Sequence, residues 1–211
     1  MHRRWTEALR NYTRALSIYR KKGNEKGKAR SYNNIGIIHK EQGRYAQAME
    51  AYEKTLAISK RLGDQAVMAA ALTNIGLIHK NQGRYAQALE FYEKSLAISK
   101  RLGDQAGMAR TLGNIGIIHD IQGRYALAME FYEKSLAIEK RLGNQAGMAA
   151  TYTNIGNIHD SQGRTALAME FYEKSLAIRK RLGDRSGIAI TLYNMGIVAY
   201  KQKYIGLAIR Y

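Results

Sequence analysis

Two polar residues recur at a fixed interval of 40 residues along this chain. They are asparagine, at Asn34, Asn74, Asn114, Asn154 and Asn194, and histidine, at His39, His79, His119 and His159. An asparagine amide both donates and accepts hydrogen bonds, so a row of them can pair with an extended peptide backbone. The histidines are one repeat apart, which is too far for ligands that must each come within about 2.0–2.1 Å of one zinc ion. We therefore interpret the asparagines as candidate binding residues and the histidines as packing residues with satisfied ring nitrogens.

Other catalytic or ligand-binding chemistry has little support in the sequence. The chain has no cysteine, which excludes disulfides, thiolate metal sites and cysteine nucleophiles. No nucleophile–base pair, phosphate-binding loop or carboxylate pair stands out from the repeat background. We expect no enzyme activity, no cofactor and no metal. The apolar runs are far shorter than the ~18 residues of a membrane span, and no targeting segment is visible, so we expect no membrane partner and a reducing, cytoplasmic location.

The elements that must position these residues are helices. In one repeat, apolar residues over 72–79 follow helical spacing, and residues 82–84 interrupt the pattern. A second helical run over residues 85–102 ends at Gly103, a good residue for a left-handed helix end, and Asp104 can cap the next helix. Each repeat is therefore predicted to form two antiparallel helices, A and then B, of roughly 16–18 residues each.

The residues of the repeat resemble those of a known family. Leu72-x2-Ile75-Gly76-x2-His79 and Ala88-x3-Tyr92 match the order and spacing of the tetratricopeptide (TPR) signature in every complete repeat. The resemblance covers essentially the whole chain and implies an all-α, TPR-like solenoid of antiparallel helix pairs wound into a right-handed superhelix. The repeat has 40 residues instead of 34, and the chain has no proline. Such long repeats are similar to those of kinesin light chains, of spindle-orientation scaffolds that modulate G-protein signalling, and of prokaryotic regulatory proteins.

The repeat also predicts how the chain is divided. Residues 29–68, 69–108, 109–148 and 149–188 are the complete repeats of one continuous array. Residues 1–28 are a truncated first repeat with helix B only, and residues 189–211 are a truncated last repeat whose helix B stops halfway. We expect apolar residues such as Trp5 and Tyr12 to make these ends adhesive. Self-assembly through the ends is therefore an alternative function, with a homo-oligomer as its product.

Gly76 and its equivalents lie inside helix A, where glycine costs roughly 1 kcal/mol relative to alanine. A recurrent glycine at such a position usually has a packing reason. We expect each one to admit the ring of a tyrosine such as Tyr92. A flexible hinge in every repeat is the less favoured interpretation.

Comparison of repeats inside the chain locates a candidate binding face. Residues 69–108 and 109–148 are identical at 30 of 40 positions, and six of the ten differences lie in helix A, five of them on one face. In the TPR family that face lines the concave groove, and long-repeat members use asparagine there for ligands. The resemblance thus implies a protein or peptide partner held by the asparagine row. The further candidate binding residues are Arg30, Asn33, Lys40, Thr73, Lys80, Asn81, Arg110, Asp120, Asn157, Asp160 and Tyr200.

These residues predict a groove that is basic near its N-terminal side and more acidic toward its C-terminal side, which suits a partner with acidic residues near one end. Two other interpretations stay open: the asparagines bond to the neighbouring helix, and the charges serve solubility. A basic nucleic-acid-binding solenoid is disfavoured despite the net charge of +17. The four complete repeats carry only +7, whereas residues 1–28 carry +7 and residues 189–211 carry +3.

Overall fold

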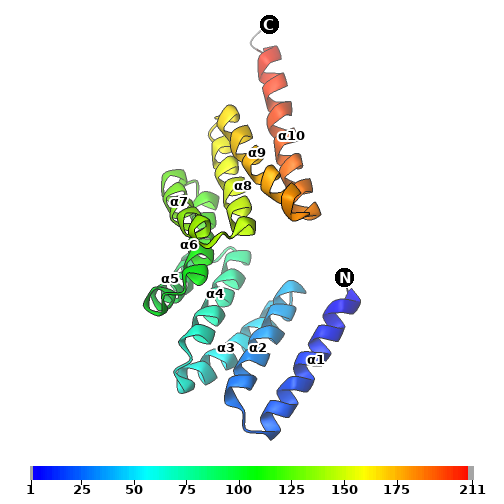
Figure 1. Ribbon diagram of the computed structural model, residues 1–211, viewed down its shortest axis with the longest axis vertical. Coiled ribbons are helices and arrows are strands. Elements are labelled where there is room, and N and C mark those ends of the chain that lie inside the picture. The colour runs from blue at the N-terminus through cyan, green and yellow to red at the C-terminus, as the bar shows by residue number, and fades with distance from the viewer. Residues whose placement is uncertain (1, 209–211) are drawn as a thin grey trace. The chain divides into compact units, whose positions relative to one another are not determined.

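The computed structural model describes the backbone of residues 2–208 and the side chains of residues 5–202. This part of the chain forms helices joined by short turns, as predicted (Figure 1). They are α1 (His2–Lys21), α2 (Glu25–Glu41), α3 (Tyr45–Leu62), α4 (Gln65–Asn81), α5 (Tyr85–Leu102), α6 (Gln105–Ile121), α7 (Tyr125–Leu142), α8 (Gln145–Ser161), α9 (Thr165–Leu182) and α10 (Arg185–Ala208).

Contacts divide the chain into two compact units, residues 1–111 and 112–211, with the boundary inside α6. In the first unit α1 to α4 each pack against the next helix, and α2 also packs against α4. In the second unit α7 to α9 do the same, and α8 also packs against α10. Helices α2, α4, α8 and α10 are helices A, and α3, α5, α7 and α9 are helices B. Within each unit, helices A therefore contact one another as well as their neighbouring helices B. The proposed repeat boundaries and the superhelical sense stay predictions.

The turns have the geometry that the glycine-acid pattern predicts. Gly63 and Gly103 end α3 and α5 in the left-handed conformation, with φ of 66° and 67°. Asp64 and Asp104 follow, and the side chain of each accepts a hydrogen bond from the backbone N–H three residues on, at 3.2 and 2.9 Å. The glycine absorbs the backbone reversal and the carboxylate satisfies an N-terminal donor of the next helix.

The end of the chain differs from its predicted organisation. Alignment at the repeat period places a turn between helices A and B near residue 203, yet α10 runs without interruption to Ala208. In the earlier repeats a glycine occupies this turn, with φ of 70–73° at Gly43, Gly83, Gly123 and Gly163. Lys203 stands at the corresponding position. Because a residue with a Cβ enters the left-handed region only at a cost, the helix continues instead of turning.

Where helices A and B of a pair meet, a glycine lies against a tyrosine ring, as expected. A Cβ built on Gly76 would lie 2.5 Å from Cε1 of Tyr92, and the same pairing recurs at Gly36–Tyr52, Gly116–Tyr132 and Gly156–Tyr172. The four tyrosines are at most 1% exposed. The mid-helix glycine therefore lowers the stability of helix A itself, and the burial of the tyrosine ring that it permits offsets this loss.

Hydroxyl groups add a second connection between the helices of a pair. Ser95 of α5 donates to the carbonyl of Ala69 in α4 at 2.9 Å, and Ser175 of α9 donates to Ala149 of α8 at 2.8 Å. Ser95 and Ser175 are fully buried. Their bonds satisfy polar atoms that would otherwise be costly inside the core.

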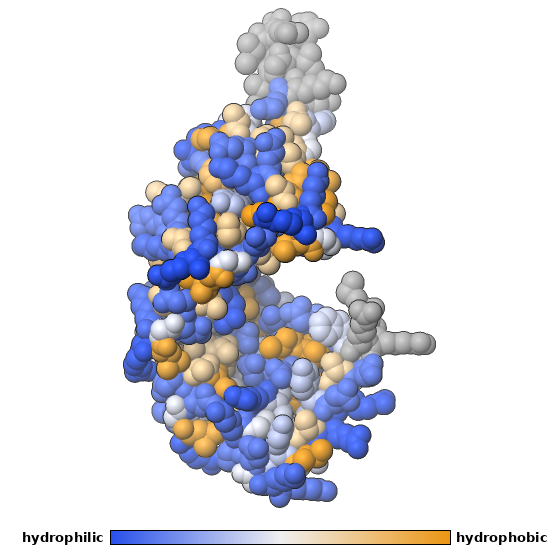
Figure 2. Space-filling model, viewed as in Figure 1, coloured by the Kyte–Doolittle hydropathy of each residue, from blue (hydrophilic) through white to orange (hydrophobic). Residues whose placement is uncertain are grey.

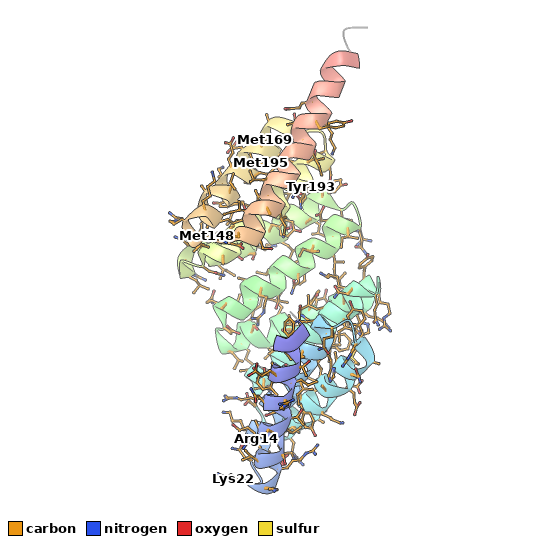
Figure 3. All side chains as sticks on the ribbon, turned by 90° about the vertical axis from the view of Figure 1, so that its right-hand side faces the viewer. Arg14, Lys22, Met148, Met169, Tyr193 and Met195 are labelled. Carbon is orange, nitrogen blue, oxygen red and sulfur yellow. The ribbon has the colours of Figure 1, made fainter. Side chains whose placement is uncertain are left out.

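Two methionines pack in the core of the second unit. Met169 and Met195 pack against a cluster of Ala168, Tyr172 and Val198, and Figure 3 shows both between the helices of the second unit. Tyr193, on the same helix as Met195, is 71% exposed. On the face drawn in Figure 2, hydrophobic residues form separate small areas among hydrophilic ones.

Substitution of the packing glycine tests its role. We expect Gly76→Ala to lower the free energy of unfolding by about 1–3 kcal/mol, because the added methyl would overlap the fully buried ring of Tyr92. Gly196→Ala is the matched control, since a Cβ there meets nothing within 4 Å. It should raise stability by about 0.5–1 kcal/mol. Urea denaturation followed by circular dichroism measures both, and equal effects of the two substitutions would contradict the packing explanation.

Candidate functional site

In the first unit, three predicted binding residues surround one hollow. Arg30, Asn33 and Asn34 of α2 line a space of about 260 Å³ together with Val67 and Ala70 of α4. Arg30 is exposed and the two asparagines are half-buried. Helical spacing explains the grouping, because positions 30, 33 and 34 share one face of α2. The hollow thus offers a guanidinium and two amides between adjacent helices A.

Two of the asparagines in the row bond to the neighbouring helix A. Asn74 Nδ2 donates to Asn33 Oδ1 across α4 and α2 at 3.2 Å. In the second unit, Asn194 Nδ2 of α10 donates to Asn157 Oδ1 of α8 at 3.1 Å. Each amide has further donors and acceptors beyond this one bond. The interpretation that asparagine links neighbouring helices is correct at these two positions, and Asn114 and Asn154 are likewise half-buried.

The basic part of the predicted groove lies in the first unit. Burial lowers the pKa of Lys80, and the nearby Lys40 ammonium lowers it further. Lys40 forms an ion pair with Glu41 at 2.9 Å. Two ammonium groups that repel each other on adjacent helices A favour an anionic group between them.

The acidic part lies in the second unit. Burial raises the pKa of Asp120, a half-buried carboxyl. Asp160 forms an ion pair with Lys201 of α10, with Nζ–Oδ2 at 2.9 Å. Burial raises the pKa of Tyr172 to about 12, and the charges of Asp160 and Asp120 contribute. The two carboxylates therefore act on the same tyrosine hydroxyl.

Asn157 has a structural partner that sequence comparison did not indicate. The Tyr172 hydroxyl donates to Asn157 Oδ1 at 2.8 Å. The equivalent tyrosine hydroxyls of Tyr52, Tyr92 and Tyr132 are buried and have no hydrogen-bond partner among the described residues. An apolar residue, Ile37, Leu77 or Ile117, stands at the position of Asn157 in those repeats. Asn157 thus provides a hydrogen-bond acceptor for the buried Tyr172 hydroxyl of its own repeat.

One predicted binding residue is placed in the core. Thr73 is 3% exposed, and its hydroxyl is bonded to Ser95 Oγ at 2.7 Å and to the Ala69 carbonyl at 3.1 Å. The prediction that Thr73 contacts a peptide is wrong, because helix B covers this position of helix A. Asn81, Arg110 and Tyr200 are exposed.

Two residues near the site were missed. Val67 lines the hollow of the first unit, and Lys201 neutralises part of the acidic charge of the second. Both differ from the equivalent residues of the neighbouring repeats, such as Gly107 and Ser161. A comparison of all the repeats, and not of two only, would have identified Val67 and Lys201 as variable positions.

The histidines pack as expected, but not with all ring nitrogens satisfied. His79 and His159 stack on Phe91 and Phe171, with ring centroids 5.2 and 5.3 Å apart. The Nδ1 atoms of His39, His79 and His159 are buried without a hydrogen-bond partner among the described residues. No group of three histidine or acidic side chains within residues 5–202 comes together as metal ligands would.

The fold and this face define an α-helical repeat protein whose adjacent helices A present a polar, charged surface. The tetratricopeptide repeat model matches residues 3–61, 67–141 and 143–211, so the chain belongs to the tetratricopeptide repeat family. A search of curated protein sequences found no match. None of the helices described here is both long enough and apolar enough to span a bilayer.

Solved structures with low sequence identity share the fold. BtubC from P. vanneervenii has a TM-score of 0.78 at 21% identity, over 92% of this chain and 82% of that one. Aspartyl phosphate phosphatase F from Bacillus subtilis has a TM-score of 0.80 at 16% identity, over 97% and 56%. NprR in complex with its cognate peptide NprX has a TM-score of 0.68 at 20% identity, over 85% and 52%. This chain spans about half the length of the last two.

The buried histidines predict a loss of stability in mild acid. Burial lowers the pKa of His39, His79 and His159, so the unfolded chain binds protons more readily than the folded one. The stability that the neutral rings contribute is present above the unfolded pKa near 6.5 and is lost as the pH falls through the lower folded values.

Urea midpoints measured between about pH 7.5 and about pH 5.5 should therefore decrease. His79→Phe, which keeps an aromatic ring on Phe91, should reduce the dependence on pH. A pH dependence that is the same in the variant and the unmodified chain would contradict this origin.

Proposed function

We propose that this chain is a protein-interaction module that binds an extended peptide segment along its helices A. The observation that carries the proposal is the hollow between α2 and α4, where Arg30, Asn33 and Asn34 meet. A peptide backbone needs donors and acceptors at intervals, and half-buried amides supply both. The relative NprR, whose structure contains its cognate peptide, supports a peptide as the type of ligand.

The charges suggest which peptide would bind in the first unit. Arg30, Lys40 and Lys80 provide positive charge on adjacent helices A, and burial together with the neighbouring Lys40 ammonium lowers the pKa of Lys80. A carboxylate placed near these groups would relieve their repulsion, so a segment with acidic residues is the complementary partner. In the second unit, the acidic groups Asp120 and Asp160 would instead favour basic residues in a segment bound there. A binding role without catalysis is the function that these residues favour.

The experiment selects ligands without assuming one. Peptides of about 12 random residues, displayed on phage, are enriched on the immobilised chain, and the affinity of the best binder is measured by fluorescence anisotropy. We expect the enriched peptides to be acidic. Arg30→Glu together with Lys80→Glu should weaken the best binder at least tenfold, or about 1.4 kcal/mol, and should redirect a new selection toward basic peptides.

The asparagine row is tested with the same peptide. We expect Asn34→Ala together with Asn74→Ala to lower the affinity about tenfold, because the peptide backbone loses two amide partners. Glu53→Gln is the control and should have no effect on the affinity, because Glu53 is exposed on α3, which is a helix B. Since Asn74 also bonds Asn33, the urea midpoint of each variant is measured in parallel. Unchanged affinity in the asparagine variant would show that the row is structural only.

A further inference from the structure

A second, apolar hollow lies in the first unit, away from the helix A face. It has a volume of about 510 Å³ between α3 and α5, with α4 beneath it. Its lining is almost entirely apolar: Leu56, Ala57, Lys60, Met68, Leu72, Lys94, Ala97 and Ile98. We name this set the α3–α5 hollow.

The hollow and the proposed peptide groove use opposite faces of α4. Met68 and Leu72 line the hollow, whereas Ala70 and Asn74 face α2. Successive residues of a helix are 100° apart, so positions 70 and 74 lie about 120–160° from positions 68 and 72. Occupation of one site leaves the other accessible.

Two lysines lie at the rim of the hollow, and one of them is ion-paired. Lys60 of α3 and Lys94 of α5 line it from opposite sides, and both are exposed. Lys94 is held by Glu90, with Nζ–Oε1 at 2.5 Å, and lies over the Phe91 ring with 5.5 Å between Nζ and the centroid. Apolar side chains beneath two ammonium groups suit an apolar group that is flanked by carboxylates.

The second unit contains the same lining with one residue changed. Leu136, Ala137, Lys140, Met148, Lys174, Ala177 and Ile178 repeat seven of the eight residues, and Tyr152 stands in place of Leu72. The Tyr152 ring packs against Phe171, with centroids 6.0 Å apart. Leu136 is buried there at 9% exposed, whereas its equivalent Leu56 is only half-buried. At this position the second unit therefore has a larger, aromatic side chain, which packs against the cluster that contains Leu136.

We propose that the α3–α5 hollow binds an acidic amphipathic helix of a partner protein, whose leucine-type side chains enter between α3 and α5. The exposed Ala57 and Ala97 leave space for such a helix to approach. A free small molecule fits the site less well, because small ligands bury most of their surface and this hollow is open to solvent on one side. Carboxylates on the partner helix pair with Lys60 and Lys94.

The probe is a synthetic helical peptide of about 16 residues with leucines at positions i, i+3, i+4 and i+7 and glutamates beside them, compared with a twin carrying lysines in place of glutamates. Isothermal titration calorimetry gives stoichiometry and affinity. We expect the glutamate peptide to bind and the lysine twin to bind at least tenfold more weakly. Lys60→Glu should reverse the order of preference.

Two reciprocal substitutions exchange the residues at the equivalent positions 72 and 152, so that each unit serves as the control for the other. Leu72→Tyr places the residue of the second unit in the hollow and should reduce the stoichiometry by one peptide per chain. Tyr152→Leu opens the equivalent position and should raise it by one. Leu72→Tyr should leave unchanged the affinity for a peptide selected on the helix A groove, so the two sites are distinguished.

Three results would overturn the proposal: no binding of the glutamate peptide to the unmodified chain, equal stoichiometry in both reciprocal variants, or loss of binding in Arg30→Glu but not in Leu72→Tyr. The last result would place the probe in the helix A groove. Circular dichroism confirms that each variant is folded, and the gain expected for Tyr152→Leu keeps the test decisive if Leu72→Tyr is destabilised.

Discussion

The contact between a glycine of helix A and a tyrosine ring of helix B is the constraint on which the helix pairs depend. At Gly76 a Cβ would be 2.5 Å from the Tyr92 ring, so the two helices approach as closely as backbone and ring allow. The ring fills the space that a side chain on helix A would otherwise occupy. Because this contact recurs in every complete pair, the rotation of each helix A is such that its glycine faces the tyrosine ring of helix B.

That rotation determines which face of helix A is available for binding. Asn74 lies two residues before Gly76, about 160° around the helix, so the face opposite the buried ring presents the asparagine. The bonds from Asn74 to Asn33 and from Asn194 to Asn157 show that this face also joins neighbouring helices A. The structural role of the asparagines is therefore compatible with the binding role that we propose for them, since one amide has several hydrogen-bonding positions. The buried glycine contact and the exposed polar face are two consequences of one helix orientation.

The same repeat produces different surfaces through a few substitutions. In the first unit Lys40 and Lys80 lie on adjacent helices A, whereas Asp120 and Asp160 take the same repeat position in the second. On the other side of α4, Leu72 lines a hollow, whereas its equivalent Tyr152 packs against Phe171 in the second unit. The Tyr172 hydroxyl donates a hydrogen bond to Asn157, whereas the equivalent Tyr92 hydroxyl has no partner among the described residues. A chain of closely similar repeats therefore offers surfaces of different charge and shape on a common scaffold.

The sequence by itself determined the helices, their turns and the family, because these depend on local patterns: helical spacing, the glycine-acid pairs at the turns and the Gly76–Tyr92 signature. It also located most of the polar face, since repeat-to-repeat variation is visible in the printed residues. The tertiary structure decided which of those residues are accessible. Thr73 shares its helix with Asn74 but is covered by Ser95, and Asp160 is paired with Lys201, 41 positions away. Such contacts depend on how neighbouring helices pack, and a position within the repeat does not specify them. Helix α10 continues past the expected turn because Lys203 replaces the turn glycine, a single difference that the 40-residue period does not take into account.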